Sequence, residues 1–92
     1  MSRKKADISK LDLDSIGGRI AYVRLRNGMS MEVFAKIISL TKGNISNFEN
    51  HKYEPSFKTI VQITEHFNVD PNWLLTGKGD PQAFTDAVRH LE

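Results

Sequence analysis

The chain has 92 residues, 39% of them hydrophobic, which suits one compact domain and is too little for two domains with a linker. It has no cysteine, so a disulfide framework, a thiolate zinc site and a cysteine nucleophile are excluded. The formal net charge of +2 permits nucleic-acid binding but does not by itself indicate it. No apolar run approaches the roughly 20 residues that span a bilayer, so we expect no membrane contact.

Residues 1–14 are expected to form a flexible basic arm. Among the first ten residues, four basic side chains oppose only Asp7, which gives a local charge of 4 − 1, or +3. The segment also has little apolar content with which to bury a core. A frayed tail is the simplest interpretation of such an arm.

A first helix is expected from about residue 16 to residue 27, ended by Gly28. Ile16, Ile20 and Val23 recur at i, i+4 and i+7 and form its apolar face, and Arg19 lies away from that stripe. The consecutive glycines at 17 and 18 each destabilise the first turn by about 1 kcal/mol relative to alanine. This helix should therefore fray at its start, or its backbone should pass close to another segment there.

Residues 30–49 predict two short helices joined by a turn. Ser30 and Thr41 are good N-caps for them, and Ser39 stands in the turn, where a left-handed residue, usually glycine, is required. The second helix of the pair should bury Ile45 and Phe48, which are spaced i and i+3. Its outward face is polar and small, and consists of Lys42, Gly43, Asn44, Ser46 and Asn47.

The second half of the chain predicts two further helices. Ser56 should cap the first of them, whose apolar stripe is formed by Phe57, Ile60, Ile63 and Phe67, spaced 3, 3 and 4. Asp-Pro at 70–71 opens a short helix that ends at residue 77, and its tryptophan is interpreted as a core residue or a subunit contact, and not as a ligand platform. Asp-Pro at 80–81 opens a final segment with apolar residues at helical spacing.

No segment alternates as a strand would, so the predicted fold class is all-α. We expect a small bundle of five helices, with a sixth if the last segment is helical. The corresponding boundaries are an arm over 1–14, a domain over 15–79 and a helical extension over 80–92, whose last two residues are interpreted as a cloning scar.

With its helices placed, the sequence resembles the lambdoid phage repressor and Cro family of helix-turn-helix domains, the XRE family, over about residues 16–79. The ending WLLTGKG at 73–79 most resembles repressors of phage or prophage origin. The resemblance implies a compact five-helix, lambda-repressor-like DNA-binding domain. It is carried by Ile16, Ile20, Val23, Met29, Ser30, Phe34, Ala35, Ile38, Thr41, Ile45, Ser46, Phe48, Glu49, Pro55, Ser56, Val69 and Asp70.

The resemblance also implies which residues meet DNA. The helix that follows Thr41 would lie in the major groove, where Lys42 can donate to guanine O6 and N7 and where Asn44 and Asn47 can pair bidentately with adenine. Gly43 belongs to the same base-reading set but lacks the side chain that the family commonly has there. The implied phosphate contacts are Ser30, Met31, Thr41, Ser46, Asn50 and Lys52.

Two further roles are implied by the same resemblance. The basic arm, through Arg3, Lys4 and Lys5, would follow the DNA backbone or a groove instead of fraying. Arg24 and Glu49 match a pair that joins the first helix to the third by a partly buried salt bridge, and this pair is interpreted as structural.

We therefore expect a sequence-specific, double-stranded DNA-binding transcriptional regulator, a repressor that binds a two-fold symmetric operator as a homodimer in the cytoplasm, at the nucleoid. No enzyme activity, cofactor, metal or small-molecule ligand is expected, since the three histidines have no ligand spacing and no catalytic motif accompanies them. The alternative is a protein-interaction module of the same fold, resembling an antitoxin or coactivator, with weak or secondary DNA binding.

Overall fold

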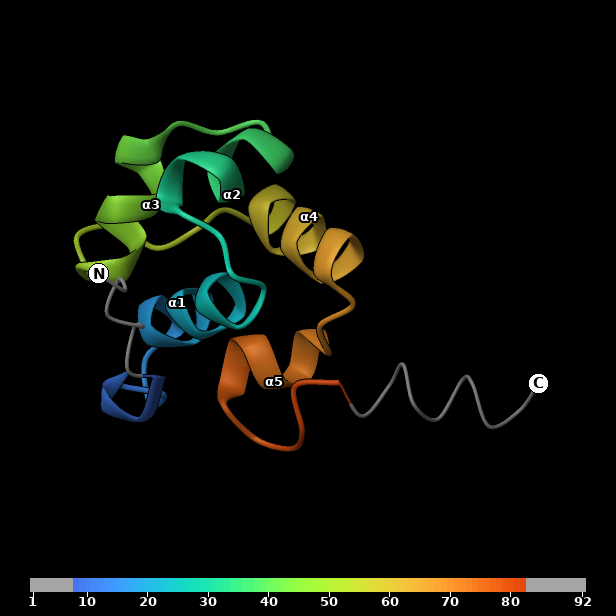
Figure 1. The fold of residues 1–92 in the computed structure, drawn as a ribbon. Helices are drawn as coiled ribbons and strands as arrows, with labels where there is room; N and C mark the ends of the chain where they lie inside the picture. The colour runs from blue at the N-terminus through green and yellow to red at the C-terminus, as the bar shows by residue number, and fades with distance from the viewer. Residues whose placement is uncertain (1–7, 83–92) are drawn as a thin grey trace.

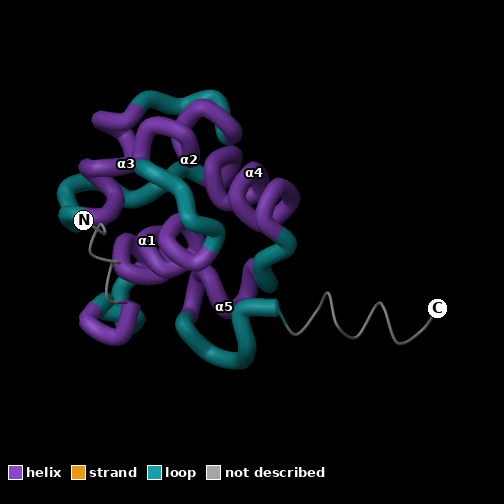
Figure 2. The backbone as a smooth tube through the Cα atoms, in the orientation of Figure 1, coloured by secondary structure: helices purple, strands orange, loops and turns teal. Residues whose placement is uncertain are grey.

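The computed structural model describes residues 8–82, which form a helical bundle (Figure 1). One 3-10 turn, η1 (Ile8–Lys10), precedes five helices. Within residues 8–82 the chain is helix or loop throughout, without a strand (Figure 2). The all-α class and the five helices are confirmed, whereas the sixth expected helix lies outside the described residues. The helices are α1 (Ile16–Arg26), α2 (Met31–Ile37), α3 (Lys42–Glu49), α4 (Phe57–Phe67) and α5 (Pro71–Thr76).

Helix α1 lies at the centre of the bundle. Figure 1 shows the pair α2 and α3 on one side of α1 and α5 on the other, with α4 beside α2. Helix α1 packs on both α3 and α5, α2 packs on α3, and α4 packs on α5. This arrangement places α3 at the edge of the domain, on the side of α1 away from α5.

Every helix begins with a side-chain cap, which satisfies an N–H group that has no partner inside the helix. Each cap contributes about 1 kcal/mol to helix stability. These positions confirm the helix starts expected from the sequence. The caps are Ser15, Ser30, Thr41, Ser56 and Asp70.

The first three helices end in the same way, with a left-handed residue and a pair of hydrogen bonds back to the last turn. Gly28, Ser39 and His51 occupy this position, with φ of 68°, 62° and 63°. After α2, the Ser39 N–H donates to the Lys36 carbonyl at 3.3 Å, and the next residue, Leu40, donates to the Ala35 carbonyl at 2.8 Å. The left-handed conformation predicted for Ser39 is confirmed, and His51 is a second non-glycine residue under the same strain.

The core is formed by one face of each helix. Phe34 of α2 and Phe67 of α4 stack within it, with ring centroids 4.8 Å apart. The expected inward residues of α3 and the tryptophan of α5 are buried. The cluster consists of Ile20, Val23, Phe34, Ala35, Ile38, Ile45, Phe48, Ile60, Ile63, Phe67, Val69, Trp73 and Leu74.

Phe57 does not join the apolar stripe of α4, and this expectation was wrong. Its side chain is 83% exposed, although Ile60 and Ile63 on the same stripe are buried. The reason is its place as the first residue of α4. Since Cα–Cβ bonds point toward the N-terminus of a helix, a side chain at the first position extends past the end of the helix and, here, past the edge of the core.

Arg19 also differs from expectation, because it is buried, with 4% of its surface exposed. Its Nε donates to the Leu74 carbonyl at 2.8 Å, its Nη1 to the Leu13 carbonyl at 2.7 Å, and its Nη2 to the Leu75 carbonyl at 3.3 Å. Two of these acceptors lie near the end of α5, where carbonyls lack helical partners. The guanidinium therefore ties α1 to α5 and to the segment before α1.

The two glycines of α1 mark close backbone approaches. A Cβ at Gly17 would collide with the Phe48 carbonyl of α3, and a Cβ at Gly18 would collide with the Asp12 carbonyl. Close approach, and not fraying, is thus the correct one of the two predicted alternatives. Residues 8–14 also differ from the flexible arm that was expected, because η1 packs against α1.

Candidate nucleic-acid interface

The polar face of α3 is supported from behind by two buried side chains, Ile45 and Phe48. The turn before α3 closes through the hydrogen bonds of Ser39 and Leu40, which set the angle between α2 and α3. On the outer side, Lys42 and Gly43 are exposed. The helix is therefore fixed in the domain by its apolar face, and its polar face remains open.

Asn44, one of the expected base readers, takes part in a capping box with Thr41. Its Oδ1 accepts hydrogen bonds from the Thr41 N–H and from the Thr41 hydroxyl, both at 2.9 Å. In return, the Thr41 Oγ1 accepts from the Asn44 N–H at 3.1 Å. The side chain of Asn44 therefore stabilises the start of α3, a role that was not expected from the sequence.

Asn47 lies one turn further along α3 and is half-buried. The side-chain amide of Asn47 has no hydrogen-bond partner among the described residues. In the same part of the chain, every buried side-chain nitrogen or oxygen has a hydrogen-bond partner. The Asn47 amide must therefore reach solvent with both its oxygen and its nitrogen available. The ammonium of Lys42 likewise has no carboxylate within ion-pair distance in residues 8–82.

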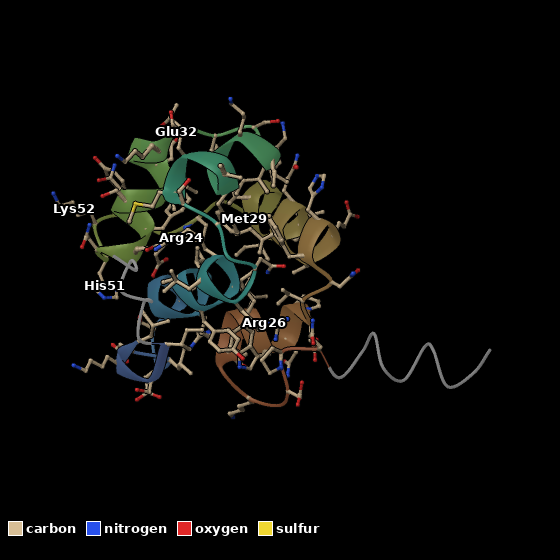
Figure 3. The ribbon with its side chains drawn as sticks, in the orientation of Figure 1. Arg24, Arg26, Met29, Glu32, His51 and Lys52 are labelled. Carbon is tan, nitrogen blue, oxygen red and sulfur yellow. The ribbon has the colours of Figure 1, made fainter. Side chains whose placement is uncertain are left out.

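Most of the expected phosphate contacts already have a role within the domain, whereas Lys52 does not. Asn50 donates through Nδ2 to the Ser46 carbonyl at 2.9 Å and to the Ser46 Oγ at 3.1 Å, so these two side chains already bond each other. Lys52 is exposed and lies at the outer edge of the domain, past the end of α3 (Figure 3). Ser30 caps α2, and Met31 packs against the core. Lys52 is the cation of this set that is free to meet a phosphate.

Arg24 and Glu49 form an ion pair between α1 and α3. The Arg24 Nε and Nη2 donate to the two carboxylate oxygens at 2.7 and 2.9 Å, and Nη1 donates to the Met29 carbonyl at 2.9 Å. The two side chains are 12% and 9% exposed. The pair thus fixes the end of α3 to α1 and to the segment before α2.

Some expected features lie outside the described residues. Arg3, Lys4 and Lys5 of the basic arm are among them. Within residues 8–82, no group of three histidine, aspartate or glutamate side chains could hold a metal ion. In the same range, no helix has the length and apolar character needed to cross a bilayer.

The geometry defines a helix-turn-helix domain, in which α3 presents a polar face beside a turn of fixed shape. Residues 17–80 match the helix-turn-helix domain family, and the chain belongs to it, as an XRE-type member. The family is one of DNA-binding transcription regulators. No curated protein matches the chain.

Solved structures share the fold at low sequence identity. The P22 c2 repressor, in complex with the synthetic operator 9T, is similar with a TM-score of 0.65 and 22% identity over 70% of this chain and 97% of that chain. The restriction-modification controller protein C.AhdI from Aeromonas hydrophila has a TM-score of 0.60 and 24% identity over 68% and 96% of the two chains. The hypothetical transcription factor NHTF from Neisseria has a TM-score of 0.61 and 18% identity over 95% of each chain.

Proposed function

We propose that this protein is a sequence-specific, double-stranded DNA-binding repressor, which binds a two-fold symmetric operator as a homodimer and occupies a promoter. The observation that carries the proposal is the polar face of α3. Lys42 and the Asn47 amide are open to solvent while Ile45 and Phe48 hold the helix in the core. An α-helix held in this way can enter the major groove without rearrangement of the domain.

The proposed dimer forms through α5 and the segment that follows it. Leu75 of α5 is 54% exposed, and an exposed leucine on a short helix can be buried by a second copy. The Pro81 carbonyl accepts a hydrogen bond from the Asp70 N–H at 2.6 Å, which holds residue 81 beside the start of α5. In such a dimer, the two α3 helices would meet half-sites about 34 Å apart, one turn of DNA.

Two measurements test this function. Selection of bound duplexes from a random pool should enrich a two-fold symmetric sequence, and sedimentation should show a dimer on that sequence. Affinity for the selected duplex should fall steeply with salt, with a slope of about −0.9 per phosphate contacted. Because the dimer carries two copies of Lys52, Lys52→Gln should make this slope shallower by about 2. Lys36→Gln, at an exposed position in the last turn of α2, should leave the slope unchanged.

A monomer both free and on DNA would contradict the proposed dimer, and equal affinity for all duplexes would contradict sequence-specific repression. A second candidate function, a protein-interaction module, is favoured by the exposure of Tyr53 and Phe57, which are 64% and 83% exposed near the start of α4. That function predicts weak DNA binding with no enriched sequence, together with loss of a protein partner in Phe57→Ser.

A further inference from the structure

The first turn of α3 offers DNA an unusual set of polar groups. Lys42 carries three N–H donors and no acceptor, and Gly43 carries no side chain. Asn44 would normally supply both a donor and an acceptor. Its two hydrogen bonds to Thr41 change what remains available.

The Oδ1 of Asn44 accepts from the Thr41 N–H and from the Thr41 hydroxyl, both at 2.9 Å. An amide oxygen has two lone pairs, so these bonds use its acceptor capacity. The Nδ2 of Asn44 has no partner among the described residues and is not buried. As long as the capping box is intact, Asn44 can only donate to a base, and the bidentate adenine pair expected from its residue type is not available to it.

Asn47 differs from Asn44 in this respect. Its oxygen and its nitrogen both remain without a partner in the described part of the chain. It therefore keeps the donor and acceptor pair that matches adenine N7 and N6. The rise of α3 separates the two asparagines by roughly 4.5 Å along the helix axis, which is on the order of one base-pair step.

On the basis of the proposed function, we propose that Lys42 and Asn44 together read a guanine and that Asn44 acts only as a donor. Asn47 reads an adenine within about two base pairs of that guanine. Guanine is the base whose major-groove edge offers two acceptors, N7 and O6, and no donor. Cytosine offers only a donor at this edge and would leave both side chains without an acceptor.

A matched pair of variants at residue 44 tests the assignment. The side chains introduced by Asn44→Gln and Asn44→Glu have the same shape as each other, and both residue types complete a capping box with Thr41. Glutamine keeps the N–H donors, whereas glutamate has acceptors only. Thermal unfolding followed by circular dichroism establishes that both variants fold, and selection from a random duplex pool gives the base preference of each.

The wild type and Asn44→Gln should enrich a guanine at the same half-site position. Asn44→Glu should lower the preference for that guanine by about tenfold, and Asn47→Ala should affect only the neighbouring adenine. The added negative charge of glutamate weakens binding to every duplex alike, so the ratio between bases remains informative. Retention of the guanine by Asn44→Glu, or a wild-type half-site with no guanine, would overturn the inference while leaving sequence-specific binding intact. Absence of any enriched sequence would instead refute the proposed function.

Discussion

The guanidinium of Arg24 meets the carboxylate of Glu49 edge to edge, with Nε 2.7 Å from Oε2 and Nη2 2.9 Å from Oε1. These residues lie 25 positions apart in the chain, one on α1 and the other in the last turn of α3. Because the remaining nitrogen donates to the Met29 carbonyl, Arg24 links three segments. This largely buried ion pair therefore adds a polar link to the apolar contacts that hold α3 in place.

Removing one partner of this pair should be more damaging than removing both. Glu49→Ala leaves the Arg24 charge without its counterion, and we expect the free energy of unfolding to fall by about 3 kcal/mol. Replacing both residues with methionine removes the uncompensated charge, so the double variant should be more stable than Glu49→Ala. Urea unfolding followed by circular dichroism measures both values, and a Glu49→Ala protein within about 1 kcal/mol of wild type would show that the pair behaves as an exposed one.

Arg19 should contribute more to stability than its neighbour Arg26 on the same helix. Arg19→Met leaves the carbonyls of Leu13, Leu74 and Leu75 without this donor, and we expect a loss of about 3 kcal/mol. Arg26 lies 5.5 Å from the ring centroid of Tyr22, a contact worth about 0.5 to 1 kcal/mol. Denaturant midpoints of the two methionine variants compare them directly, and equal losses would contradict the special role of Arg19.

The left-handed ends of α2 and α3 carry strain that glycine would remove. Ser39→Gly and His51→Gly should each raise the free energy of unfolding by about 1 kcal/mol, since glycine adopts positive φ without a clash. The reverse change, Gly28→Ala, should lower it by a similar amount, because no atom lies within 4 Å of the added Cβ and only the backbone conformation matters. Melting temperatures that move in the same direction in all three variants would be inconsistent with this explanation.

Glycine to alanine should have opposite effects in α1 and α3. At Gly18 the new methyl group collides with the Asp12 carbonyl, and we expect a loss of about 2 kcal/mol or more. At Gly43 the nearest atom is the Thr41 Oγ1 at 3.7 Å, an ordinary contact, so alanine should stabilise the helix by about 1 kcal/mol. Thermal unfolding of the two variants distinguishes them, and a destabilised Gly43→Ala would show that α3 requires glycine there for a reason of packing.

Local signals in the sequence were sufficient to predict the helices of the domain. Caps such as Ser30 and Thr41 act within one or two turns of a helix, and so does the spacing of Ile45 and Phe48. These signals can therefore be recognised in the sequence without knowledge of the fold. The pattern failed at Phe57, because periodicity shows on which side of a helix a residue lies but not where the core ends. The sequence also carried a signal that was missed, since Thr41 followed three residues later by an amide resembles a capping box, in which glutamate or glutamine is usual.

Other features depend on contacts between distant segments and had no local signal. Two of the three acceptors of Arg19 belong to residues 55 and 56 positions further along the chain. The consecutive glycines at 17 and 18 indicated a close approach, but not that the partner of residue 17 is a carbonyl of α3. For the candidate interface, residue types alone suggested equal roles for Asn44 and Asn47, and the difference between them emerged only when their hydrogen bonds were known.

Trp73 is the chain's single tryptophan, is buried in α5, and meets the Tyr22 ring of α1 edge to face at 5.6 Å. Its fluorescence therefore reports the contact between α1 and α5, on the side of α1 away from α3. Unfolding of the domain should change this emission strongly, whereas a duplex bound at α3 of a dimer that has already formed should leave it nearly unchanged. One optical signal thus follows the integrity of the fold during a DNA titration, independently of occupancy at the reading face.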